Sequence, residues 1–132
     1  MSTQGSTPKP NDTAGSFAAR AEERFFTLDH VGVVRHIEGV ELQGVMPQVK
    51  SILAAHGGQT EDALEEIRGM PVYTAIATLR NGLTVWVKAT QVGGVGVVVD
   101  AKLFHSTEQS AQADEQLSLF IDELQERVLG RS

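Results

Sequence analysis

Three apolar runs with strand-like alternation fill the middle of the chain. They cover Val72–Arg80, Leu83–Val92 and Val95–Phe104 and are rich in valine and other β-branched residues, which are common in strands. Asn81-Gly82 and Gly93-Gly94 separate the runs, and such dipeptides supply the positive φ angles of two-residue hairpin turns. The pattern therefore predicts an antiparallel meander of three strands.

Two-residue turns fix the register of a hairpin, so neighbours across these strands can be predicted. Ala77 is expected opposite Trp86, and Trp86 opposite Ala101. One face of the sheet then collects Tyr73, Ala75, Ala77, Leu79, Trp86, Val97, Val99, Ala101 and Leu103. The other face carries Val72, Ile76, Val85, Val87 and Val98, mixed with Thr74, Thr78, Asp100 and Lys102.

The second face is too apolar to remain in water. Burial of apolar surface stabilises a fold by about 25 cal/mol per Å². Several aliphatic side chains left in water would therefore cost several kcal/mol of folding free energy, which is comparable to the net stability of a domain. We expect a helix of this chain, the segment Phe25–Leu42 or a second copy of the chain to cover it. The predicted partner-binding residues on this face are Ile76, Val85, Val87, Val98 and Asp100.

The first half of the chain predicts shorter elements. Ser16 is a candidate N-cap for a helix over Phe17–Arg24, a stretch rich in helix-forming residues. Phe25–Leu42 fits both strand and helix periodicity, but its valines and glycines favour an extended segment, which would add a fourth strand. Val45–Gly58 and Thr60–Gly69 each predict a short helix that ends at glycine.

The last quarter of the chain predicts an amphipathic helix. Apolar residues recur there at intervals of three or four, as on one face of a helix, at Leu117, Phe120, Ile121, Leu124 and Val128. Ser106 or Thr107 would cap the polar lead-in to this helix. The predicted fold class is thus α+β, with the meander packed against two short helices and a C-terminal helix.

Composition limits the domain organisation and the partners. Residues 1–15 are nearly all polar, Gly or Pro and are expected to form a disordered tail, followed by one domain over 16–132. With a net charge of −6 and no cysteine, nucleic acid is an improbable partner and disulfides are excluded. Nucleic-acid binding would need a local basic face made by Arg20, Arg24, Arg35 and Lys50. No apolar run approaches the roughly 20 residues that span a bilayer, and no secretory signal is evident, so we expect a cytoplasmic protein without a membrane anchor.

Candidate chemistry is sparse. The four histidines, His30, His36, His56 and His105, lack the close helical spacing of a zinc site, so we expect no metal and no cofactor. His36 and Glu38 would share a strand face and could form an acid–base pair, and His105 is a second candidate acid or base. The glycines at 93, 94 and 96 join two strands, unlike a phosphate-binding loop, which precedes a helix.

We therefore expect a non-catalytic protein-binding module, adaptor-like or chaperone-like, that forms a homodimer or binds another protein through a sheet edge, a sheet face or a helix. In its small size, acidity and mixed composition the chain is similar to small bacterial secretion chaperones, although the two share no motif. The alternative is a small enzyme or ligand-binding domain with a pocket between the sheet and the helices, served by His36 with Glu38, or by His105.

Overall fold

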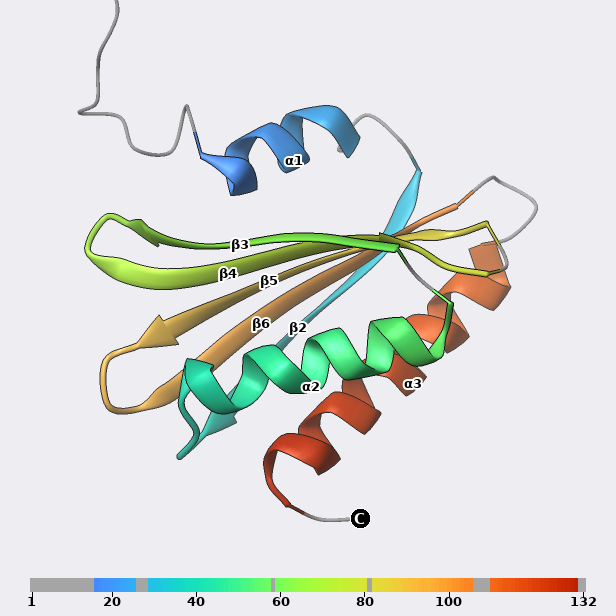
Figure 1. Ribbon diagram of the computed structural model, residues 1–132. Coiled ribbons are helices and arrows are strands. Elements are labelled where there is room, and N and C mark those ends of the chain that lie inside the picture. The colour runs from blue at the N-terminus through green and yellow to red at the C-terminus, as the bar shows by residue number, and fades with distance from the viewer. Residues whose placement is uncertain (1–15, 26–28, 58, 81, 106–109, 131–132) are drawn as a thin grey trace, which may run out of the picture.

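Five antiparallel strands form one open sheet in the order β2-β6-β5-β4-β3 (Figure 1). The computed structural model describes residues 16–25, 29–57, 59–80, 82–105 and 110–130. The strands are β2 (His30–Glu38), β3 (Gln59–Ile67), β4 (Met70–Thr78), β5 (Thr84–Val92) and β6 (Gly96–Phe104). Helix α1 (Phe17–Phe25) covers one face, and α2 (Leu42–Ala55) and α3 (Ser110–Val128) cover the other. The predicted α+β class is confirmed.

Most of the predicted elements are present. Strands β4, β5 and β6 form the meander, and the extended interpretation of Phe25–Leu42 is confirmed by β2. This first strand pairs with the last one, from His30 opposite Phe104 to Glu38 opposite Gly96. The predicted N-cap of α1 is also observed, because the backbone N–H of Ala19 donates to Ser16 Oγ at 2.9 Å. Residues 1–15, Asn81, Ser106 and Thr107 lie outside the described residues.

The helix predicted over Thr60–Gly69 is wrong, because this segment forms strand β3. Residues 59–67 pair along their whole length with β4, and this pairing overrides their helical composition. Arg68 and Gly69 have φ angles of 55° and 80° and join β3 to β4 as a two-residue turn. Such a turn requires positive φ at both central positions, so Gly69 closes a hairpin instead of ending a helix.

The predicted register of the meander is wrong by one residue at both turns. Trp86 lies opposite Ile76 on one side and Lys102 on the other. The reason is turn length: the N–H of Leu79 donates to the carbonyl of Leu83 at 2.7 Å, which leaves three residues in the first loop, and Val92 pairs with Gly96 around three residues in the second. A shift of one residue moves a strand's side chains to the opposite face of the sheet.

This shift exchanges the two faces of β5. Val85 and Val87 lie in the main core beneath α2 and α3, whereas Trp86 lies on the face covered by α1. The sheet residues of the main core are Tyr73, Ala75, Ala77, Val85, Val87, Ala89, Val97, Val99, Ala101 and Leu103. Trp86 is fully buried in a smaller cluster with Ile76, Phe104 and Ala21. The helices of this chain therefore bury much of the apolar sheet surface that the sequence pattern predicted would need a cover.

A carboxylate from β3 holds the beginning of α1. Glu65 accepts hydrogen bonds from the backbone N–H groups of Phe17, at 2.8 Å, and Ala18, at 3.3 Å. The first N–H groups of a helix have no partner within the helix and carry partial positive charge. Glu65 thus satisfies two of them and fixes α1 over the β3–β4 side of the sheet.

Candidate functional site

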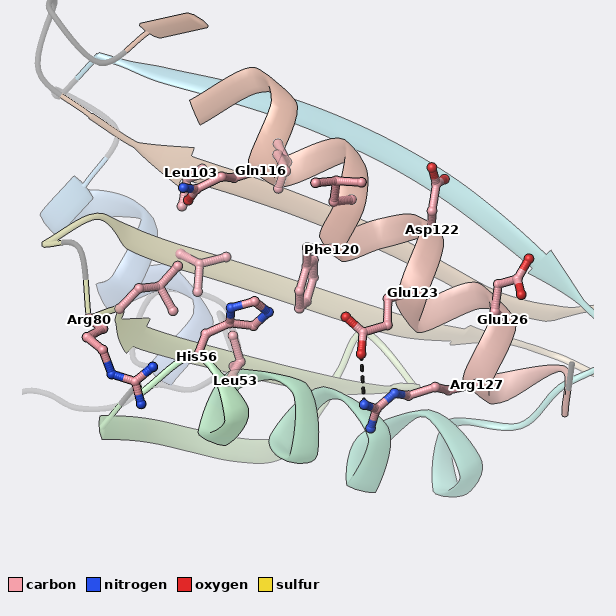
Figure 2. Close-up of a pocket in the computed structure, with 14 residues that line it drawn as sticks. Leu53, His56, Arg80, Leu103, Gln116, Phe120, Asp122, Glu123, Glu126 and Arg127 are labelled. Atoms are coloured by element: carbon pink, nitrogen blue, oxygen red, sulfur yellow. Dashed lines mark ion pairs between the residues drawn. The ribbon is translucent and has the colours of Figure 1, made fainter. Parts of the chain in front are cut away.

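A pocket of roughly 910 Å³ lies between α2, α3 and the sheet. This volume is in the range of small-molecule sites in proteins. Figure 2 shows that α3 forms one wall and α2 the other, with the strands behind them. Leu119, which is 62% exposed, lies at the solvent-facing side of the pocket.

The inner surface of the pocket is apolar. Its residues come from α2, from the end of β4, from β5 and β6, and from α3: Leu53, Leu79, Val85, Leu103, Leu117 and Phe120. Phe120 projects between the two helices (Figure 2) and is 8% exposed. This surface belongs to the main core, so it is rigidly packed from behind.

One end of the pocket carries two basic side chains, His56 and Arg80. They meet because the N–H of Arg80 donates to the carbonyl of His56 at 3.1 Å, which joins the β4–β5 turn to the end of α2. Gly57 makes room for the guanidinium, since a Cβ at this position would lie 2.9 Å from Arg80 Nε. No described residue forms a hydrogen bond or ion pair with the side chain of His56 or Arg80.

The other end of the pocket is acidic. Figure 2 shows Glu126 and Arg127 at the end away from Arg80. Arg127 is neutralised there, because its Nη2 lies 2.7 Å from Glu123 Oε2 and its Nη1 donates to Ser51 Oγ on α2 at 3.1 Å. The pocket is therefore electrically polarised, with Arg80, which no described residue neutralises, at the opposite end from Glu126.

A second candidate surface is the outer edge of β2. The N–H of His105 donates to the carbonyl of Asp29, and the N–H of Gly39 donates to the carbonyl of Val95. Alternate residues of an antiparallel strand bond to the same neighbour, so the odd-numbered residues from 29 to 39 bond to β6. The even-numbered residues of β2 direct their backbone N–H and C=O groups away from the sheet.

The side chains of these even-numbered residues lie on the α1 side of the sheet, near the edge that α1 leaves uncovered. Val34 is 63% exposed, and His36 and Glu38 are also exposed. A Cβ at position 32 would lie 3.4 Å from Lys102 Cγ. Glycine at this position therefore leaves room for the aliphatic part of the Lys102 side chain. Lys102 is already engaged, because its Nζ lies 3.0 Å from Asp100 Oδ1.

The opposite edge of the sheet differs in charge. Strand β3 has the sequence QTEDALEEI, in which four of nine residues are acidic. Two such strands side by side would repel each other, and charge on an edge strand is a recognised protection against pairing. The edge of β2, where no further strand is described, carries one formal charge among its outward residues, at Glu38.

The five predicted partner-binding residues do not share one face. Val85 and Val87 are buried by α2 and α3, so their predicted place on the second face is wrong, for the reason of register given above. Ile76 is 7% exposed and packs near α1. Val98 and Asp100 are half-buried beside β2 on the α1 side. The role of all five residues in partner binding stays a prediction.

The histidine candidates lie away from the pocket. His36 and Glu38 share a strand face as predicted, but that face is opposite the pocket, and neither residue lines it. His105 does not line it either. The pocket histidine is His56, which sequence reasoning did not single out: its only signal is its position at the end of a predicted helix, and nothing in the sequence links it to Arg80.

Lys88, a charged residue within the largely apolar strand β5, is paired with an acid of α1. It lies on the α1 side of the sheet, with its Nζ 3.9 Å from Glu22 Oε2 of α1 and its side chain 31% exposed. Among the residues that the structure describes, no group of three or more histidines and acids could hold a metal ion.

The chain matches no protein-family model, no curated protein and no solved structure in the comparisons made. In the described part of the chain, none of the helices combines the length and apolar character needed to cross a bilayer.

Proposed function

We propose that this chain is a non-catalytic protein-binding module that pairs with a second copy of itself along β2. The observation that carries the proposal is the weakly charged outer edge of this strand, which pairs with no other described strand and contrasts with the acidic edge of β3. Unpaired backbone groups on an edge strand are a template for strand addition. A homodimer joined there would have one continuous sheet of ten strands, given the five in each copy.

The chemistry of β2 favours one register. A twofold axis at Val34 pairs all nine residues of β2 with their equivalents in reverse order. Val34 then lies opposite Val34 of the second copy, and His30 lies opposite Glu38 of the second copy. The outward-directed backbone groups of Gly32, Val34 and His36 meet those of their equivalents in this register, which gives about six hydrogen bonds between the copies.

Side chains support the same register. Two exposed valines meet at its centre, where side chains directly opposite each other in an antiparallel pair are close enough to interact. Arg35 is not available to oppose the pairing, because its guanidinium is engaged by Asp122 at 3.3 Å and by Gln125 on the helix side of the sheet.

The test is the mass of the intact chain in solution, measured by light scattering and by sedimentation. We expect about twice 14.2 kDa. Val34→Lys places two ammonium groups opposite each other at the axis and should give a monomer. Leu64→Lys is the matched control, because Leu64 is 58% exposed on the other edge, and it should leave the dimer intact.

A spin label reports on the register itself. The chain has no cysteine, so Val34→Cys and Leu64→Cys each accept a single label. In the proposed dimer two labels at position 34 lie close together, so strong dipolar broadening of the spin-label spectrum is expected. Labels at position 64 lie far apart on the outer edges, so no broadening is expected. A monomeric wild-type chain, or a dimer that survives Val34→Lys with an unbroadened label at position 34, would refute the proposal.

A further inference from the structure

The pocket between α2 and α3 is a different surface from the β2 edge, and its charges indicate the kind of molecule that it accepts. We propose that it binds an aliphatic carboxylate, with the carboxylate held by Arg80 beside His56 and the hydrocarbon chain against Phe120. This assignment combines three observations: the volume of roughly 910 Å³, the apolar inner surface, and the guanidinium of Arg80 beside the imidazole of His56 at one end.

The position of Arg80 explains how an anion would be held. Its guanidinium lies against Gly57 and its backbone is tied to His56, so the side chain is located at the pocket without being neutralised by a described residue. A guanidinium has a planar set of donors that matches both oxygens of a carboxylate. His56 offers a second donor from the end of α2.

The rest of the pocket selects against other head groups. Asp122, Glu123 and Glu126 also line it, toward the end away from Arg80. Asp122 and Glu123 are paired with Arg35 and Arg127, so the repulsion comes chiefly from Glu126, and it is stronger for a doubly charged phosphate than for a singly charged carboxylate. Glu126 would attract a cationic amphiphile, but the head group would then lie at the acidic end, far from Arg80.

The hydrocarbon part of the ligand has a preformed surface. Phe120 lies between the basic and acidic ends (Figure 2), and Leu53 and Leu79 also line the pocket; all three belong to the main core or pack against it. A chain that leaves water for this surface gains free energy in proportion to the apolar area that it buries. Binding should therefore strengthen with each added methylene until the chain reaches the acidic end.

The test is a calorimetric titration of the full chain with three probes of equal length below their micelle concentrations: decanoate, decanol and decylammonium. Decanoate should bind in a saturable manner and at least about tenfold more tightly than decanol, because a hydrogen-bonded charge is worth that factor or more. Equal affinities for decanoate and decanol, or saturable binding of decylammonium alone, would overturn the proposal.

Variants locate the head group. Arg80→Gln should weaken decanoate at least about tenfold and leave decanol unchanged, while Arg80→Lys should restore part of the loss. Arg68→Gln is the matched control, since Arg68 is exposed at the turn at the other end of β4, and it should bind decanoate like the wild type. Decanoate affinity that is the same in Arg80→Gln and Arg68→Gln would refute the assigned site.

Two further measurements separate loss of the site from loss of the fold or of the dimer. Circular dichroism and the melting temperature of Arg80→Gln should match those of the wild type. The Val34→Lys variant should bind decanoate normally, because the pocket lies on the opposite face of the sheet from Val34. Failure of decanoate to bind any of these chains would overturn the pocket proposal and leave the dimer proposal unaffected.

Discussion

Replacement of Glu65 by alanine should release α1 from the sheet while the rest of the fold remains. The carboxylate accepts hydrogen bonds from the N–H groups of Phe17 and Ala18, at 2.8 and 3.3 Å. A hydrogen bond to a charged group contributes roughly 1.5–3 kcal/mol, and this pair is half-exposed, so we expect a total loss of about 2 kcal/mol. Among the described side chains of α1, the apolar contacts with the sheet are those of Phe17, Ala18 and Ala21, and we expect them not to hold the helix alone.

The effect should be local. Parts of a protein with few buried contacts open without global unfolding, and 2 kcal/mol corresponds to about a thirtyfold change in an equilibrium. Hydrogen exchange in the peptide that contains residues 17–25 should therefore accelerate about thirtyfold, with little change in β4–β6. Trp86, the only tryptophan in the chain, is fully buried in the cluster next to α1, so its fluorescence should shift to longer wavelength.

Glu66→Ala is the control for this experiment. Glu66 is adjacent and exposed, and its side chain points to the other face because successive residues of a strand alternate. It has the same charge and the same helix and strand propensities as Glu65. Equal exchange rates of α1 in the two variants would show that the Glu65 contacts do not hold the helix.

Other consequences can be measured separately. Trp86→Ala should lower the free energy of unfolding by roughly 3–5 kcal/mol in denaturant titrations, since the ring is fully buried, and a near-neutral result would contradict its place in the α1 cluster. Gly96→Ala should cost about 1–3 kcal/mol, because a Cβ there would lie 2.3 Å from a backbone carbonyl of β2; an unchanged melting temperature would be inconsistent with that approach. Burial and the Asp62 carboxylate, 2.7 Å from the phenol oxygen, raise the pKa of Tyr73 far above its ordinary value of 10.0. The folded phenol should stay protonated above pH 10 while the unfolded phenol ionises, so stability should fall as the pH rises past about 10, and a phenolate absorbance at that pH in the folded protein would disprove this.

The candidate surfaces were only partly predictable from the sequence. Strand addition at a sheet edge was one of the modes expected, but the edge itself was identified only when β2 was seen to lie outside β6. A pocket between the sheet and the helices was expected as well, yet its histidine was expected to be His36 or His105 and is His56. The signal was missing because His56 and Arg80 are brought together by a contact between the end of a helix and a turn far along the chain.

The amino-acid sequence alone determined which segments are apolar and where glycines allow the chain to reverse. It thereby determined the meander, the cap of α1 and the presence of the helices α2 and α3. The tertiary structure decided the face on which each strand residue lies, because one additional residue in each of two turns reversed the faces of β5, including the place of Trp86. It also decided that residues 59–67 form a strand: the neighbouring β4 supplies backbone hydrogen bonds along all nine residues, and no local preference of an acidic segment contains that information.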